Sequence, residues 1–386
     1  MSRPRRTRSR FALVVLLVTV GTHLTFALAA IELMRLAGAP RPGLAGCALA
    51  LVLFVSFMHR MRRLFPDRPR SPIALHFVEE PFFAHWCAAL GSFIPIAGYA
   101  IVKVAILAAL GQPLRLPSTF ALAAYALALG LSLWGVFIRR RWVLIRELEL
   151  VMPGLPREFD GYRVAQLSDL HIGGLTPARW GERWAKRSNA AAPNLVVVTG
   201  DLVSSGVDFH DDIARVIGSL RAEDGVYVSM GNHDYFGDGE PLITLLRSKG
   251  AIVLRNEGTT VTRGNAQLFV AGVDDTWTRR ADLGRALEQR EPGAFTLLLS
   301  HDPALFPAAA KQGISLVLSG HTHGGQVALP FFPKLVSLGK LAHRFHLGLY
   351  HDGDSTLYVH PGLGTTGPPI RVGVAPEIAI LTLRAA

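Results

Sequence analysis

Five short segments of this sequence place Asp, Asn or His directly after an apolar run. They read SDLHIGG at 168–174, TGDLV at 199–203, GNHD at 231–234, LSHDP at 299–303 and SGHTHGG at 319–325. Each has an ordinary explanation by itself, because an Asp after a strand often caps a helix and Asn-His is common turn chemistry. Turns do not explain all five segments in order, four of them with at least one His.

Carboxylate, amide and imidazole groups gathered in one place indicate metal ions. Burying these groups together is costly unless cations compensate them. The mixture of oxygen and imidazole nitrogen ligands suits Mn, Fe or Zn better than an ion that prefers oxygen alone. Cys47 and Cys87 both lie in or beside apolar runs, as small packing residues do, so we expect no cysteine ligand.

The elements that must position these groups begin near Leu148, where short β-rich runs alternate with amphipathic helical segments. The predicted strands are 163–167, 195–199, 226–229, 268–271, 296–299, 315–318, 357–359 and 378–383. The predicted helices include 177–190, 211–220, 241–249, 281–289 and 303–312. This alternation predicts an α/β layered domain, in which ligands bind where strands end.

The five segments together resemble the calcineurin-like metallophosphoesterase superfamily, whose pattern is D-x-H, G-D, G-N-H-D/E, a lone His and G-H-x-H. The match runs over about residues 161–383, and no motif is missing. Four apolar N-terminal runs and the closing stretch HPGLGTTGPPIR at 360–371 look like the transmembrane and membrane-associated branch. The resemblance implies a β-sandwich flanked by helices in four αββα layers, with two divalent metal ions at the strand ends.

The resemblance also implies a role for each residue of the site. One metal ion would be held by Asp169, His171, Asp201 and His323, and the other by Asp201, Asn232, His301 and His321. Asp201 would therefore bridge the two ions, which at a separation of about 3.5 to 4 Å lower the pKa of a bound water and clamp the phosphoryl oxygens. His233 resembles the histidine that protonates the leaving oxygen or stabilises its charge, and Asp234 would orient its imidazole.

Four apolar runs, at 11–33, 44–58, 86–110 and 120–138, precede the catalytic part. A membrane span needs about 17 to 25 residues, so we predict four transmembrane helices at about 11–33, 42–59, 86–110 and 118–138. We expect a membrane domain at 1–142 and a catalytic domain at 147–386. The alternatives are a signal peptide for the first run, disfavoured by the three runs that follow, and a buried core helix for the second.

The charge is unevenly distributed along the chain. Residues 1–142 carry 17 Lys and Arg against four Asp and Glu, a net charge of +13, whereas residues 143–386 carry 23 against 25, a net charge of −2. A catalytic domain that binds nucleic acid should itself carry a basic face, so we expect no nucleic-acid partner. The excess of Arg instead flanks the apolar runs, as it does where a membrane protein fixes its orientation.

Orientation follows from the Arg residues beside the predicted helices. One side has Arg3, Arg5, Arg6, Arg8, Arg10, Arg60, Arg62, Arg63, Arg68, Arg70, Arg139, Arg140 and Arg141, and the other has Arg35, Arg41 and Arg115. Because Lys and Arg are retained on the cytoplasmic side, this bias predicts an inner or plasma membrane protein with a cytoplasmic catalytic domain.

The leading hypothesis is a phosphoesterase of a phosphorylated lipid or lipid-linked phosphodiester. It rests on the membrane helices and on segment 330–345, where apolar residues alternate with Lys334, Lys340 and Arg344 as on a surface that lies on an anionic membrane. The alternative for this segment is a covered insertion. The alternative functions are a tethered phosphatase or phosphodiesterase of soluble nucleotides and a catalytically silent metal-binding receptor. The receptor is disfavoured because no ligand is missing.

Overall fold

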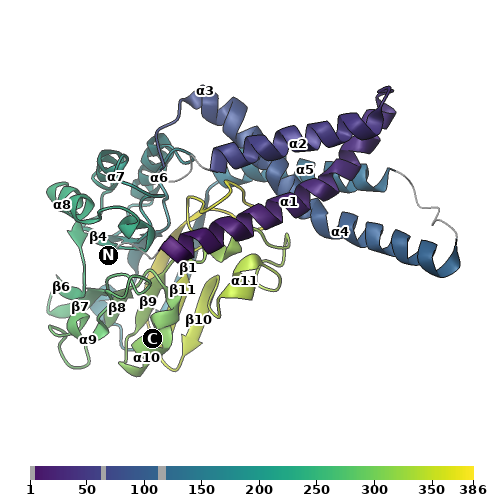
Figure 1. The fold of residues 1–386 in the computed structure, drawn as a ribbon. Helices are drawn as coiled ribbons and strands as arrows, with labels where there is room; N and C mark the ends of the chain where they lie inside the picture. The colour runs from purple at the N-terminus through teal and green to yellow at the C-terminus, as the bar shows by residue number, and fades with distance from the viewer. Residues whose placement is uncertain (1–4, 62–66, 112–118) are drawn as a thin grey trace. The chain divides into compact units, whose positions relative to one another are not determined.

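The computed structural model describes residues 5–61, 67–111 and 119–386 (Figure 1). Arg3, Arg62, Arg63, Arg115 and the start of the fourth expected span, at 118, lie outside the described residues. The chain divides into two compact units. One contains residues up to Ile138 except the short segment 66–71, and the other contains that segment together with residues 139–386.

The first unit is helical. Its helices are α1 (Arg5–Leu36), α2 (Pro42–Met61), α3 (Pro72–Ala74), α4 (Glu80–Leu110) and α5 (Phe120–Phe137). A π-helical turn, Leu75–Glu79, joins α3 to α4, so the third helical run begins at Pro72, well before the expected start at 86. Among the described residues, four helices are long and apolar enough to cross a membrane, which confirms the expected four-helix region of this membrane protein.

Small residues let these helices pack closely. Phe26, Ala29 and Ala30 of α1 pack in one buried cluster with residues of α2, α4 and α5. At Gly46 of α2 a Cβ atom would overlap the backbone of Ile31 in α1, so only glycine fits this contact. Close approach of this kind is how helices associate in lipid, where burial of apolar surface gives little driving force.

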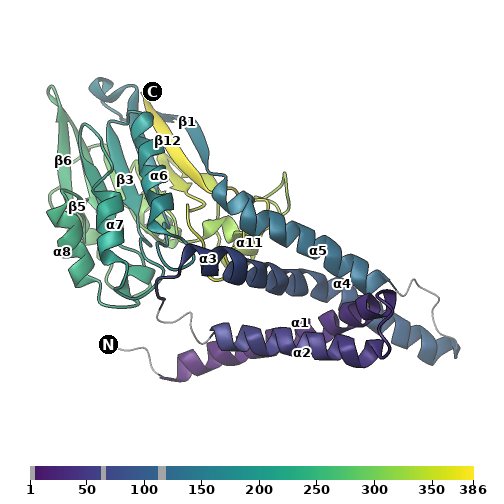
Figure 2. The same cartoon turned by 90° about the horizontal axis from the view of Figure 1, so that it is seen from above.

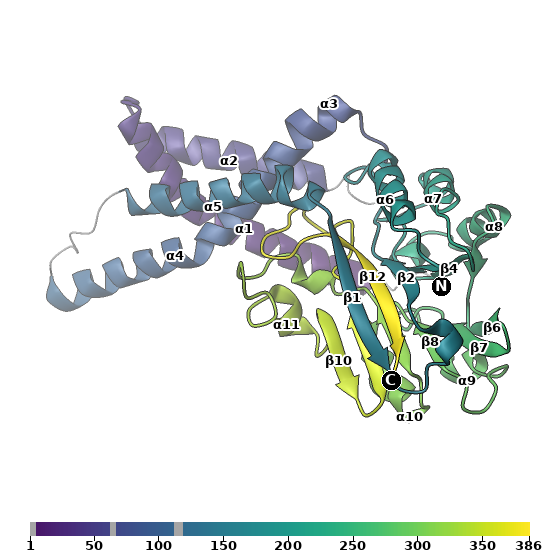
Figure 3. The ribbon, with the colours of Figure 1, turned by 180° about the vertical axis from the view of Figure 1, so that it is seen from behind.

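The second unit contains two six-stranded sheets. The first has the order β1 (Leu144–Met152), β12 (Glu377–Ala385), β2 (Tyr162–Leu167), β3 (Leu195–Thr199), β4 (Val226–Ser229) and β5 (Ile252–Val253). The second has the order β10 (Gly348–Asp352), β11 (Ser355–Val359), β9 (Leu316–Ser319), β8 (Thr296–Leu299), β7 (Ala266–Gly272) and β6 (Glu257–Arg263). Strands β2 to β5 are parallel neighbours, as are β7, β8 and β9. Figure 3 shows β1 beside β12, its parallel partner.

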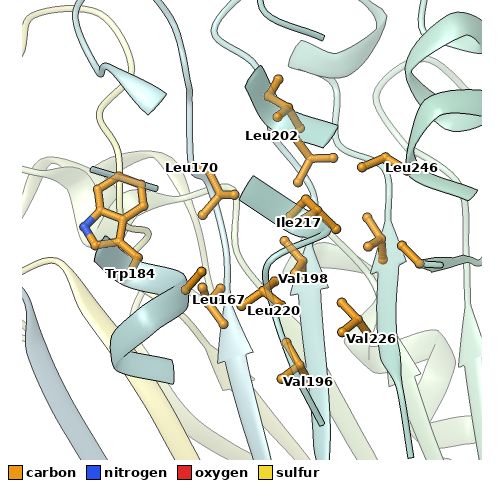
Figure 4. Close-up of a cluster of buried hydrophobic side chains, with 14 of the residues drawn as sticks. Leu167, Leu170, Trp184, Val196, Val198, Leu202, Ile217, Leu220, Val226 and Leu246 are labelled. Atoms are coloured by element: carbon orange, nitrogen blue, oxygen red, sulfur yellow. The ribbon is translucent and has the colours of Figure 1, made fainter. Parts of the chain in front are cut away.

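Alternation along the strands divides the core into layers. Val164, Val197 and Leu297 belong to the cluster between the two sheets, whereas Val196 and Val198 face the other way. On that outer face they meet α6 (Ala178–Ala190), α7 (His210–Ile217) and α8 (Glu240–Ser248), which lie side by side along the sheet (Figure 2). Figure 4 shows Val196 and Val198 beside Ile217 and Leu220.

The outer face of the second sheet is covered by a further cluster. It packs strand residues against Ala286 of α9 (Leu283–Ala286) and Phe306 of α10 (Phe306–Lys311). The remaining helix, α11 (Leu338–Ala342), follows β9. The layers are therefore helix, sheet, sheet and helix, and the expected αββα sandwich is confirmed.

Candidate metal centre

The predicted ligands gather where five parallel strands end. Asp169 follows β2, Asp201 follows β3 and Asn232 follows β4 in the first sheet. His301 follows β8 in the second sheet, and His321 and His323 follow β9. Because parallel neighbours end at one edge, side chains that are distant in sequence meet there.

The backbone at these positions is unusual. Asp169, His171, Asp201, His321 and His323 have φ angles between 45° and 71°, in the left-handed region. Such a conformation costs on the order of 1 kcal/mol or more at a non-glycine residue and persists only where the surroundings hold it. Backbone hydrogen bonds hold two of these turns, since Asp169 donates to Gly200 and His171 donates to Asp201, each at 3.0 Å. Strain of this kind concentrates at functional sites.

Two groups of ligand atoms share Asp201. In the first group, His171 Nε2 lies 3.0 Å from His323 Nε2, and His323 Nε2 lies 3.4 Å from Asp169 Oδ1. In the second, His301 Nε2 lies 3.3 Å from Asp201 Oδ2 and 3.2 Å from His321 Nδ1. Asp201 Oδ2 is also 3.5 Å from His171 Nε2, so this carboxylate lies between the two groups.

These atoms fit divalent cations. Two ligands of one ion, each about 2.1 Å from it and set at right angles, lie about 3.0 Å apart, which is the spacing between His171 and His323. Asn232 Oδ1 is buried and finds no hydrogen-bond partner among the described residues. A buried acceptor in a native structure is rarely left unsatisfied, and a metal ion would satisfy this one.

Without an ion, burial and charge set the protonation of the centre. Burial lowers the pKa of His301, but the Asp201 carboxylate outweighs it and the pKa rises to about 10. Burial by itself raises the pKa of Asp201, but the His301 charge outweighs burial and holds that pKa well below its usual value. Burial lowers the pKa of His171 to about 3 and of His321 to about 4. These two imidazoles are therefore neutral, the form that binds metal.

His233 lies beside the two groups. Its backbone N–H donates to Asp201 Oδ1 at 2.9 Å, and its Nδ1 donates to the Ser204 carbonyl at 2.7 Å. Because a carbonyl only accepts, Nδ1 carries the proton, and Nε2 is the nitrogen available for chemistry, 3.5 Å from Thr366 Oγ1. Ligand atoms of His171, Asp201 and His233 also lie within 4.8 Å of one another.

Asp234 was expected to orient the His233 imidazole, but its hydrogen bonds go to the backbone. Its Oδ1 accepts hydrogen bonds from the backbone N–H of Leu202 at 2.8 Å and of Val203 at 3.2 Å, and its Oδ2 accepts one from Gly231 at 2.8 Å. No hydrogen bond joins it to the His233 ring within residues 139–386, all of which are described. A buried carboxylate needs such donors. Ser204 orients the imidazole, and Asp234 ties the turn after β4 to the turn after β3.

The sequence did not single out Arg371, which lies beside the centre. Its side chain is fully buried and donates to the carbonyls of Gly362 at 3.0 Å and Gly364 at 2.6 Å, with Nη2 3.4 Å from His323 Nδ1. Burial lowers the pKa of Arg371 to about 9. A signal was present, because Arg371 ends the stretch HPGLGTTGPPIR.

The segment 330–345, which we call the apolar–basic segment, is exposed and adjoins the centre. Phe331 is 93% exposed and Leu341 is 85% exposed, and neighbouring apolar side chains are also open to solvent. The segment reaches the ligands through His343, whose ring centroid lies 5.5 Å from that of His321. The alternative of a covered insertion does not fit these exposed side chains.

Comparison with known proteins agrees with this geometry. Residues 162–325 match the calcineurin-like phosphoesterase family. The chain is 30% identical over 236 residues to the uncharacterized metallophosphoesterase YkuE of Bacillus subtilis, covering 60% of this chain and 82% of that protein. It is 31% identical to the uncharacterized metallophosphoesterase YkoQ of the same organism, covering 58% of this chain and 84% of that protein.

A relative whose name describes a transmembrane protein also matches. The chain is 33% identical over 270 residues to the "transmembrane protein with metallophosphoesterase domain" of Danio rerio, covering 66% of this chain but 61% of that protein. The strand-end ligand groups and the relatives converge, and this membrane protein belongs to the calcineurin-like metallophosphoesterase family of metal-dependent phosphoesterases.

Proposed function

We propose that this protein hydrolyses a phosphate ester of a membrane lipid or a lipid-linked phosphodiester, with two divalent metal ions. The observation that carries the proposal is the exposed apolar–basic segment, which adjoins the candidate metal centre through His343. Exposed apolar side chains grouped together mark an interaction site, and beside the metal centre such a site suits a lipid substrate.

Seven side chains would hold the ions. Asp169, His171, Asp201 and His323 would bind one, and Asp201, Asn232, His301 and His321 the other. The position of Asp201 between both groups supports its role as the bridge. The donor set suits Mn, Fe or Zn. When bound, the ions would supply the positive charge that lowers the pKa of a water molecule and offsets the charge of the phosphoryl oxygens.

His233 would act on the leaving group. The Ser204 carbonyl fixes the ring through Nδ1, which leaves Nε2 as the atom that meets the leaving oxygen. A proton held at Nε2 would pass to that oxygen as the ester bond breaks, and this is general acid catalysis. The backbone N–H of His233 donates to Asp201, so the distance between the general acid and the bridging ligand would be held constant.

The apolar–basic segment supports a lipid as the substrate. Phe331 and Leu341 offer apolar surface, while Lys334 and Lys340 are exposed between them in the sequence. Lys and Arg beside apolar side chains suit the surface of an anionic bilayer, where each basic residue contributes about 1 kcal/mol. The four membrane helices already keep the chain at a bilayer.

We further propose that the centre faces the cytoplasm of an inner or plasma membrane. The 13 Arg residues beside the helices on one side, against three on the other, support this orientation. The substrate would then be a lipid of the cytoplasmic leaflet.

The test compares substrates on one preparation of the full-length protein in manganese. Phosphatidic acid and a lipid phosphodiester in mixed micelles would be compared with adenosine monophosphate, cyclic AMP and bis-p-nitrophenyl phosphate. We expect the lipid esters to be preferred. The double variant Phe331→Ser/Leu341→Ser should lose lipid hydrolysis and keep hydrolysis of the nitrophenyl ester.

The matched control is Val151→Ser, since Val151 is 66% exposed and lies outside the segment. It should leave both activities unchanged. Preference for the nucleotides would replace the lipid proposal by that of a tethered nucleotide phosphatase. Binding of manganese with no hydrolysis of any ester would favour the silent receptor.

A further inference from the structure

The short segment 67–71, between the second and third membrane helices, belongs to the same compact unit as residues 139–386, which we call the catalytic unit. We propose that Asp67 is a positioning residue of the metal centre, which holds together the loop after His171 and the loop that orients His233. The proposal rests on the roles given above to these two histidines. A residue between two membrane spans would therefore contribute to hydrolysis.

Asp67 makes hydrogen bonds and an ion pair with neighbouring residues. Its Oδ2 accepts a hydrogen bond from Gly174 N at 2.8 Å, and its Oδ1 pairs with Arg70 Nη1 at 2.8 Å. Its own backbone N–H donates to Ser205 Oγ at 3.3 Å. Asp67 is 5% exposed, and a carboxylate so buried requires these partners. One residue thus joins Gly174, in the loop after β2, to Ser205, in the loop after β3.

These two loops carry the groups that matter for chemistry. The loop after β2 contains His171, whose carbonyl accepts a hydrogen bond from Ser204 Oγ at 2.8 Å. The second contains the Ser204 carbonyl, which fixes His233 through Nδ1. Asp67, the loop of His171 and the loop of Ser204 therefore form a closed ring of contacts. Loss of Asp67 would remove the contact that joins Gly174 to Ser205.

The two glycines after His171 are shaped for this contact. A Cβ atom at Gly173 would overlap the Asp67 carboxylate and Ser204, and one at Gly174 would overlap Arg70 and the Arg68 carbonyl. Neither glycine has a positive φ, so the backbone conformation does not require glycine at these positions. Close approach of segment 67–71 explains both.

Arg140, in the short 3-10 turn that follows α5, holds the neighbouring position of the same loop. Arg140, 2% exposed, donates from Nη2 to the Leu175 carbonyl at 2.9 Å and from Nη1 to the Pro369 carbonyl at 3.4 Å. Its guanidinium also lies over the Trp180 ring, 4.8 Å from the centroid. Successive residues of the loop after His171, Gly174 and Leu175, are thus tied to the segments that lead into the membrane.

The contact also constrains membrane topology. Residue 67 and the catalytic unit must lie on the same side of the bilayer for Asp67 to reach Gly174. The two helical runs between them, Pro72–Leu110 and Phe120–Arg141, must therefore both cross or both fail to cross. The Arg residues in segment 67–71 agree with the cytoplasmic side proposed for this unit.

The test is a double-mutant cycle in the full-length protein with Asp67→Ala and Gly174→Ala. Partners outside the ligand set typically change metal affinity or activity about 10- to 100-fold, so each single variant should lose turnover of a nitrophenyl ester by about that factor. The double variant should lose no more than the worse single variant, because both changes remove the same contact. Arg68→Gln, an exposed neighbour in the same segment, should behave as wild type.

Two further readouts separate positioning from folding. If His233 is misplaced, the loss in Asp67→Ala should be larger for a phenyl than for a p-nitrophenyl leaving group, whereas a smaller folded fraction would reduce both equally. Binding of manganese alone should weaken about tenfold, a result that needs no substrate and stands apart from the lipid proposal. Asp67→Asn, which keeps an acceptor for Gly174 N, should fold and show an intermediate loss.

The proposal is overturned by multiplicative losses in the double variant, by wild-type turnover in Asp67→Ala, or by equal loss on both leaving groups with unchanged manganese affinity. If Asp67→Ala does not fold, the cycle is run with Asp67→Asn, and the same three results decide.

Discussion

A methyl group added at Gly231 should disable the centre by moving Asp201. A Cβ atom at Gly231 would overlap the Asp201 carboxylate and its backbone nitrogen, and the φ of Gly231 is compatible with alanine. To restore ordinary contact, Asp201 must shift by about 1 Å, and a displacement of that size costs about 100-fold in rate. Gly231→Ala should therefore lose about 2.7 kcal/mol of transition-state stabilisation.

The assay is turnover of bis-p-nitrophenyl phosphate by the full-length protein, with metal content and melting temperature measured on the same sample. The control is Gly284→Ala, because a Cβ atom there meets nothing closer than 3.5 Å. It should match wild type. Wild-type turnover in Gly231→Ala would mean that the position of Asp201 is not critical, and the reasoning that makes it the bridging ligand would fail.

Four other predictions follow from the centre and the helices. Asp201→Asn should lose both metal ions and hydrolysis, and two full equivalents by metal analysis with normal turnover would remove the bridging role. His233→Ala should keep both ions and lose turnover by about 10² to 10⁴-fold, less for nitrophenyl esters; loss of one ion would make it a ligand instead. In the metal-free protein, pairing with Asp201 raises the pKa of His301 from 6.5 to about 10, so its stabilisation is complete below pH 6.5 and lost as pH rises through 10. Manganese binding at pH 8 should accordingly release a proton, and calorimetry in two buffers that shows none would contradict this. A reporter fused after Ala386 should be active only in the cytoplasm, and cleavage of the domain by protease outside sealed cells would reverse the proposed orientation.

Strands with continuous apolar runs could be predicted closely. All five residues of β3, LVVVT, are buried, and its bounds match the prediction, as do those of β4 and β8. Strand β6, Glu257–Arg263, was missed because it is an edge strand rich in Thr whose side chains are largely open. The helix expected at 281–289 is only Leu283–Ala286, and Asp282 caps its start by accepting a hydrogen bond from the backbone N–H of Arg285.

The residue types of the candidate site could be predicted, but the contacts that position those residues could not. Strand ends followed by Asp, Asn or His pointed to candidate ligands, and the structure brings the Asp and His side chains among them together. The residue types do not predict that His171 and His323 adopt positive φ angles, because such a backbone conformation depends on contacts between loops. Ser204 orients His233 through its backbone carbonyl group, which every residue has, so the residue type at position 204 does not predict this contact. Asp67 meets Gly174 across 107 positions.

The pairing of β1 with β12 has a consequence for biosynthesis. Strand β1 follows directly on the last membrane helix, but its ladder with β12 runs from Leu144 and Glu377 to Met152 and Ala385. Nearly the whole catalytic unit is therefore synthesised before β1 has a partner, and until then β1 and the edge of β2 that faces β12 both stay open. Unpaired edges attract other chains, and pairing over such a sequence distance is slow. During this interval the nascent protein, already inserted in the bilayer, depends on chaperones or on its confinement at the membrane to avoid association with its neighbours.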